Sequence, residues 1–138
     1  MQKKISTVLT MGNPSMVPGE IYLANFHFAE ATGVNLRPVL LLTPPVGPIP
    51  EVIVAYITSM PPEAPLPSDL VIHPSLPGGF GTNLKTSSAI RLHKVATLHA
   101  WSLVRYLGKL PPETVNEVGA RLRALLGPIT LGIPSEVV

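Results

Sequence analysis

Prolines divide this chain into short apolar segments, and their spacing limits what the chain can fold into. The 138 residues include 17 prolines, many of them clustered between apolar runs, as in residues 44–50 and 60–67. Proline interrupts helices and the interior of sheets, so the pattern predicts short strands joined by stiff loops. The length fits one domain, and 46% hydrophobic residues against 13% charged ones exclude a disordered chain.

Six segments have the apolar or β-branched composition of strands, and one has the pattern of a helix. The predicted strands cover residues 19–28, 37–43, 51–59, 68–74, 87–98 and 102–110. Residues 111–127 predict a helix because prolines open it, Glu113 lies in its first turn and Gly127 ends it. Its apolar stripe comprises Val115, Val118, Leu122, Leu125 and Leu126. We therefore expect a mainly β fold, a small antiparallel barrel with a C-terminal α-helix.

Composition also disfavours several classes of site. The chain has no cysteine, so it can form neither a disulfide nor a thiolate zinc site, and this suits a reducing cytoplasm, where we expect it to act. No apolar run approaches the roughly 18 residues of a membrane span. The four histidines lack metal-ligand spacing, so we expect neither a metal nor another cofactor. Residues 78–86, GGFGTNLKT, lack the glycine that precedes the lysine of a phosphate-binding loop.

Charge is distributed unevenly, although the net charge is only +2. Residues 18–80 carry one basic and five acidic side chains, a net charge of −4, whereas residues 81–127 carry seven basic and two acidic ones, a net charge of +5. A basic second half suggests an anionic partner such as nucleic acid or an acidic peptide. The alternative is an ordinary solvated face.

Alternation along residues 87–98 predicts two polar side chains on one face. If Ile90 and Leu92 face the core, then Arg91 and His93 face the other way, about 7 Å apart. A guanidinium can hold the charge of a phosphodiester while an imidazole moves a proton near neutral pH. The alternative is that both are ordinary surface residues of a barrel.

An arginine–proline pair, Arg37 and Pro38, opens the second predicted strand. Pro38 favours an extended backbone at Arg37, and an arginine held in this way loses less entropy when it binds an anion. At the end of the third strand, the hydroxyls of Thr58 and Ser59 can donate to a phosphate oxygen. Each feature also has a structural interpretation: Arg37 caps its strand in solvent, and the two hydroxyls cap the ladder, which is the favoured interpretation for them.

Two strand segments, 37–43 and 51–57, are apolar on both alternations. A small barrel has too little interior for all of these side chains. We therefore expect a two-fold homodimer that buries the excess.

Five segments follow one another within residues 18–127: PGEIYLANF, RPVLLL, VAYITS, SSAIRLHKVATL and LGKLPPETVNEVGARLRALLG. In this order they resemble the MazF/PemK toxins of toxin–antitoxin systems, most of all in the RP pair and the closing helix. The resemblance implies an SH3-like barrel plus helix for residues 18–127. Residues 1–17 would then be an N-terminal tail or an extra edge strand, and residues 128–138 a C-terminal tail.

The resemblance also implies a homodimeric growth inhibitor that cleaves single-stranded RNA without a metal or the ribosome. An antitoxin with an acidic, flexible tail would inhibit it by covering the RNA groove. The chemistry we expect is attack of the substrate's own 2′-OH, which gives a 2′,3′-cyclic phosphate and a 5′-OH. The family's functional arginine falls on Arg37 and its functional threonine on Thr58, with Ser59 beside it. His93 is the alternative general acid or base.

Three further basic residues, Arg91, Lys94 and Lys85, are expected to bind RNA. The best-known members of the family carry an aspartate–glutamine pair where this chain has His93 and Lys94, and many have a basic residue where it has Ala96. These departures support the alternative function, a barrel that binds RNA or an acidic antitoxin-like peptide without cleaving it.

Overall fold

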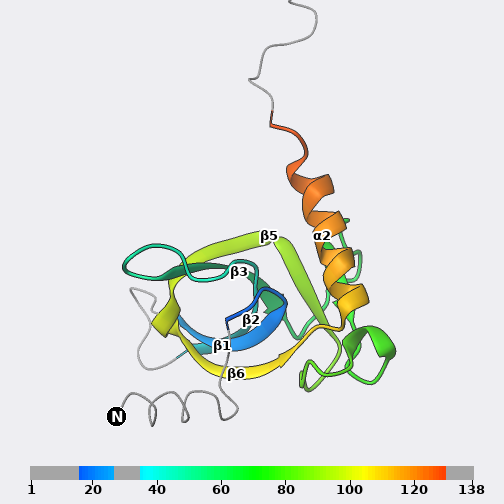
Figure 1. Ribbon diagram of the computed structural model, residues 1–138. Helices are drawn as coiled ribbons and strands as arrows, with labels where there is room; N and C mark the ends of the chain where they lie inside the picture. Colours follow the sequence, from blue (N-terminus) through cyan, green and yellow to red (C-terminus); the bar gives the residue numbers. More distant parts are fainter. Residues whose placement is uncertain (1–15, 27–34, 130–138) are drawn as a thin grey trace, which may run out of the picture.

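Six strands and one α-helix make up the part of the chain that the structure, a computed structural model, describes: residues 16–26 and 35–129 (Figure 1). The strands are β1 (Glu20–Phe26), β2 (Asn35–Leu41), β3 (Glu51–Thr58), β4 (Asp69–Ile72), β5 (Ser88–His99) and β6 (Leu103–Lys109). The α-helix is α2 (Pro112–Leu126), and two short 3₁₀ helices are η1 (Pro77–Gly79) and η2 (Ala100–Ser102). The predicted mainly β fold with a C-terminal helix is confirmed.

The strands form one antiparallel sheet in the order β4-β5-β3-β2-β1-β6. The first three strands pair in sequence order, and β6 returns to lie beside β1. In Figure 1, β5, β3, β2, β1 and β6 follow one another around a barrel-like outline, and α2 stands beside it. The sheet is therefore strongly curved, as a small barrel requires.

Two apolar clusters cover opposite faces of the central strands. The helix-side core comprises Ile21, Leu40, Ala55, Ile57, Leu70, Ile72, Ile90, Leu92, Leu110 and Val118. The opposite core comprises Tyr22, Ala24, Val39, Leu41, Val52, Val54, Ala100 and Leu103. A strand that is covered on both faces needs apolar side chains at successive positions, and this explains the continuous apolar composition of β2.

The premise that one chain cannot bury both alternations is wrong for β2. Val39, Leu40 and Leu41 are each at most 1% exposed within a single chain. Of β3, only Ile53 and Tyr56 among the large apolar side chains stay exposed, at 39% and 36%. A single chain buries both alternations because it has two cores instead of one. Less apolar surface is therefore left for a partner.

A bulge in β5 departs from the simple alternation expected for this strand. Tyr56 of β3 pairs with Arg91, but the preceding residue of β3, Ala55, pairs with Val95. The β5 strand therefore carries three extra residues, 92–94. An odd number of extra residues reverses which face each later side chain meets. One strand therefore serves both cores: Ile90 and Leu92 lie in the helix-side core, while Ala96 and Leu98 pack against the opposite core.

The helix begins and ends within one residue of the prediction, but its expected apolar stripe is only partly correct. Of that stripe, Val118 is buried and Leu122 packs partly against the helix-side core. Leu126 is 69% exposed, and Val115 and Leu125 are also exposed. Beyond its first turns the helix extends away from the sheet (Figure 1), so its last apolar residues meet no strand.

Other boundaries shift slightly. The second strand covers residues 35–41 instead of 37–43, and η1 lies within the predicted loop at 75–83. The expectations for residues 1–15, 27–34 and 130–138 lie outside the described residues. Within residues 16–26 and 35–129, we find no helix with the length and apolar composition to cross a bilayer.

Candidate functional site

The hydrogen-bond ladder between β2 and β3 ends early, and a proline explains why. The two strands pair along β2 from Leu41 to Val39 and no further. Leu42 donates its N–H to the carbonyl of Ile53 in β3 at 2.9 Å. Every second residue of a strand turns its backbone N–H toward the same neighbouring strand, so the backbone nitrogen of Pro38, four residues earlier, also faces β3. Pro38 has no N–H to extend the ladder by the next pair.

A cavity of about 310 Å³, called here the Arg37 cavity, opens where this ladder ends. Side chains and backbone of β2, β3 and β5 line it: Arg37, Pro38, Tyr56, Ile57, Thr58, Arg91 and Lys94. The register explains the grouping, because Tyr56 pairs with Val39 on one side and with Arg91 on the other. Arg37 lies two residues before Val39, so the pleat directs it to the same face.

Arg37 lies at the solvent-exposed end of the opposite core. Its cross-strand partner on β1, Ala24, is fully buried, whereas Arg37 itself is exposed. In the described part of the chain, no hydrogen bond or ion pair of the Arg37 side chain is found. A guanidinium in this position can offer its full set of donors to an anion in the cavity.

Arg91 is held by a buried carboxylate. Its Nε donates to Oδ1 of Asp69 at 2.9 Å and its Nη2 to Oδ2 at 3.4 Å, and the Asp69 side chain is fully buried. Burial alone would raise the pKa of Asp69, but hydrogen bonds from Arg91 and from the N–H of Leu66, together with the charge of Arg91, hold the pKa below its usual value. Asp69 thus holds one edge of the Arg91 guanidinium, and Arg91 lines the Arg37 cavity.

The two hydroxyls expected at the end of the third strand are separated. Thr58 lines the Arg37 cavity, and its Oγ1 also accepts a hydrogen bond from the N–H of Met60 at 3.1 Å. This bond matches the capping interpretation. Ser59 is exposed and lines a second cavity, of about 450 Å³, together with Lys85. Pro38 borders both cavities.

His93 lies on the same side of β5 as Arg91 but lines neither of these two cavities. Its Nδ1 is 2.7 Å from Oγ of Ser68 and 4.0 Å from Oδ1 of Asp69. The predicted pairing of Arg91 and His93 on one face is therefore confirmed, since both side chains meet Asp69. Arg91 is held by Asp69, and His93 lies against Ser68 and Asp69, so neither side chain is free on the surface.

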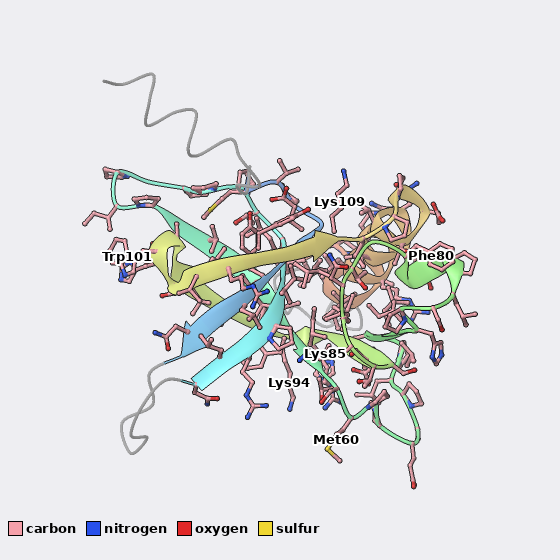
Figure 2. All side chains as sticks on the ribbon, turned by 90° about the horizontal axis from the view of Figure 1, so that it is seen from below. Met60, Phe80, Lys85, Lys94, Trp101 and Lys109 are labelled. Carbon is pink, nitrogen blue, oxygen red and sulfur yellow. The ribbon has the colours of Figure 1, made fainter. Side chains whose placement is uncertain are left out.

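The Arg37 cavity has a strongly positive lining. Arg37, Arg91 and Lys94 contribute cations, and no acidic side chain is among the described residues that line it. Asp69 balances Arg91, which leaves an excess of about two positive charges. Lys94 and Lys85, both labelled in Figure 2, line the Arg37 cavity and the second cavity, respectively. Within the described ranges, no group of three His, Asp or Glu side chains could hold a metal ion.

Most of the chain matches the model of one protein family. The model for the PemK-like, MazF-like toxin of type II toxin–antitoxin systems matches residues 17–126. The chain belongs to this toxin family. The match covers every described strand and the helix, as the sequence resemblance predicts.

Solved structures of MazF toxins share the fold of this toxin. An endoribonuclease in complex with its cognate antitoxin from a mycobacterial species is 20% identical, with a TM-score of 0.57 over 83% of this chain and 98% of that one. Mycobacterium tuberculosis toxin MazF-mt6 is 20% identical, with a TM-score of 0.59 over 78% and 95%. A MazE–MazF structure from Deinococcus radiodurans is 21% identical, with a TM-score of 0.57 over 80% and 94%. A search of curated proteins found no significant match.

Sequence reasoning missed two residues of the site, Asp69 and Tyr56. An acidic residue at the head of a short apolar strand is a usable signal for a buried charge pair. Its partner, Arg91, can be identified only from the register that places the two residues opposite each other on β4 and β5. Tyr56 gave no comparable signal, because its position between Val39 and Arg91 depends on the pairing of three strands.

Proposed function

We propose that this toxin is an endoribonuclease that cleaves single-stranded RNA without a metal ion and acts in the cytoplasm. The observation that carries the proposal is the Arg37 cavity at the end of a sheet ladder. In it, an arginine that has no partner among the described residues meets a threonine hydroxyl and two further cations. Such a lining suits a phosphodiester, because the cations balance its charge and the hydroxyl can donate to a phosphate oxygen. Membership of a toxin family that includes endoribonucleases supports the same activity.

In the proposed reaction, the 2′-oxygen of the substrate attacks the neighbouring phosphorus and the 5′-oxygen of the next nucleotide leaves. The 2′-OH loses its proton, the leaving oxygen gains one, and the products are a 2′,3′-cyclic phosphate and a 5′-OH. The nucleophile is already next to the phosphorus, so the protein has to orient the backbone and stabilise charge. A metal is not needed to generate it.

Arg37 is proposed to stabilise the charge that develops on the phosphoryl oxygens and to take part in proton transfer. Thr58 accepts from Met60, and its hydroxyl is 3.5 Å from the Met60 carbonyl, so its proton can turn to a phosphate oxygen at little cost. Arg91 and Lys94 would hold the RNA backbone. His93 remains the alternative general acid or base, although it lies outside the cavity lining.

Expressing the toxin alone in bacteria should arrest growth and fragment cellular RNA. Purified protein should cut a single-stranded RNA oligonucleotide, and its products should carry 2′,3′-cyclic phosphate and 5′-OH ends, as mass spectrometry of the fragments would show. EDTA should leave the rate unchanged. Cleavage that depends on added metal, or fragments with 5′-phosphate ends, would contradict this mechanism.

A second function, binding without cleavage, is favoured by one specific feature. The best-known members of the family carry an aspartate–glutamine pair where this chain has His93 and Lys94, and many have a basic residue where it has Ala96. Unimpeded growth together with retained binding of RNA, or of an acidic peptide, would support this alternative. The expression experiment therefore separates the two functions directly.

An antitoxin with an acidic, flexible tail is the proposed protein partner. The positive lining of the Arg37 cavity supports this, since an acidic segment could occupy the place of the RNA backbone. A mycobacterial neighbour was solved with its cognate antitoxin, and a Deinococcus radiodurans neighbour as a MazE–MazF structure. Occupation of the cavity by such a tail would exclude the substrate.

A two-fold homodimer is also proposed, on a smaller surface than the sequence suggested. Ile53 and Val95 are exposed at 39% and 51%, and the pairing of Ile53 with Thr97 and of Ala55 with Val95 places them on one face of β3 and β5. Light scattering at tens of micromolar should give the mass of a dimer. A monomer at that concentration would contradict the proposal.

A further inference from the structure

The second cavity adjoins the Arg37 cavity at the point where β2 and β3 part. Its volume is about 450 Å³, and Pro38 belongs to both linings. Thr58 lines the first cavity and the following residue, Ser59, lines the second. Arg37 and Pro38 are successive residues of β2 and face opposite sides of the strand, so the two cavities lie on either side of β2 and meet where its pairing with β3 ends. A chain of nucleotides with one phosphate at Arg37 would reach the second cavity through this gap.

The second cavity is rigidly built from β6 and the segment before β5. Gly108 lets this segment approach closely, because a Cβ there would collide with the carbonyl oxygen of Gly81. The N–H of Lys109 donates to the same carbonyl at 3.0 Å. Asn83 donates its amide N–H to the carbonyl of Leu107 at 2.6 Å and adopts a positive φ of 58°, a conformation that asparagine tolerates better than most residues.

The lining combines positive charge with hydrogen-bonding and apolar groups. Lys85 and Arg105 are exposed cations whose side chains have no hydrogen bond or ion pair in the described part of the chain, and none of the described lining residues is acidic. Because the Asn83 amide nitrogen is committed to Leu107, its Oδ1 is left to accept from a ligand. Leu23, Leu84 and Tyr106 supply apolar surface.

We propose that the second cavity binds a nucleotide next to the scissile phosphate of the RNA. Lys85 and Arg105 hold its phosphate, Asn83 accepts a hydrogen bond from its base, and the apolar wall covers the base face. This inference rests on the proposed function, because it places the scissile phosphate at Arg37. It assigns to this cavity a share of the sequence preference of cleavage, at the base whose donor group meets Asn83.

Other exposed features of the molecule do not join this path. Figure 2 shows Trp101 and Phe80 at opposite ends of the view, well away from Lys85 and Lys94. Trp101 stacks on His99 with ring centroids 4.2 Å apart, and Phe80 lines a different cavity with Lys109. Lys109 is thus an exposed cation outside both proposed RNA cavities, and it provides a matched control.

The test uses the full chain, a fluorescent single-stranded RNA and a pool of RNA oligonucleotides with randomised positions. The double variant Lys85→Ala/Arg105→Ala should raise KM and weaken RNA binding about tenfold or more, lower the salt dependence of binding, and change kcat little. Lys109→Ala should behave as the wild type does. Asn83→Gly keeps the positive φ but removes the amide, and it should weaken base preference at one position about three- to tenfold.

The outcomes separate this inference from the proposed function. If the wild type cleaves RNA and the double variant binds and cleaves like Lys109→Ala, the second cavity is not a nucleotide site, and the endoribonuclease proposal stands. If the wild type binds RNA without cleaving it, but binding depends on Lys85 and Arg105 and not on Lys109, the proposed activity fails and the nucleotide site stands. Unchanged base preference in Asn83→Gly would overturn the role given to its amide.

Discussion

Replacing Arg37 with alanine should lower the rate of RNA cleavage at saturating substrate by at least about a hundredfold, as is typical for loss of one preorganised charge donor. RNA binding should weaken far less, because Arg91 and Lys94 stay in the same cavity. The physical reason is that Arg37 is proposed to meet charge that develops only in the transition state. Single-turnover cleavage of a labelled oligonucleotide measures the rate, and fluorescence anisotropy measures the binding.

Two further variants sharpen this result. Arg91→Ala should have the reverse effect if Arg91 only contacts the RNA backbone: binding and its salt dependence fall, while the rate at saturating RNA survives. Arg37→Lys keeps the charge but loses the planar fork of donors, and we expect it to remain slow. Full activity in Arg37→Lys would reduce Arg37 to an electrostatic anchor, and the catalytic role would pass to another group such as His93.

Replacing Asp69 with alanine should lower the free energy of unfolding by about 2–3 kcal/mol. Removal of one partner from a fully buried ion pair typically costs roughly 3–5 kcal/mol, and the smaller value applies because the Arg91 side chain is 23% exposed. Urea denaturation monitored by circular dichroism gives the measurement. Glu117→Ala is the matched control: it removes a carboxylate from an exposed pair with Arg121 and should cost about 0.5 kcal/mol or less.

The effect of Asp69 should also depend on pH. Because its pKa is lowered in the folded state, the carboxylate contributes stability that is fully present above its unfolded pKa of about 4 and is lost as the pH falls through the folded value. The difference in stability between wild type and Asp69→Ala should therefore be largest near neutral pH and shrink in acid. A difference that grows on acidification, or that is absent at pH 7, would mean that the Asp69–Arg91 pair does not stabilise the fold.

Much of the fold could be predicted because the local signals in this chain agree with one another. Prolines mark the loops, β-branched runs mark the strands, and the prolines and Gly127 mark the ends of the helix. The bulge at residues 92–94 could not be predicted, because Ile90, Leu92, Ala96 and Leu98 keep a regular even-numbered pattern although they enter two different cores. Only the pairing with β3 reveals the change of face.

The residues that line the Arg37 cavity could be predicted only one at a time. Arg37, Thr58, Arg91 and Lys94 were identified individually, and the structure brings all four to one cavity. Ser59 and Lys85 were expected in the same site but line the adjoining cavity, and the buried position of Asp69 behind Arg91 was not foreseen. The register between strands decides which side of a strand end a residue faces and which charged residue lies opposite it on the next strand. A single sequence does not specify this register.

Pro38 also bears on how stable this toxin can become while it keeps its proposed activity. Any other residue at this position would restore an N–H and let β2 and β3 pair for one more step, a net gain of about 0.5–1.5 kcal/mol for a typical hydrogen bond. The same step would draw the two strands together between Arg37 and Thr58 and narrow the cavity that they line. Selection for stability alone would remove the proline, whereas selection for RNA cleavage would retain it, so a single backbone hydrogen bond sets a trade-off between the two.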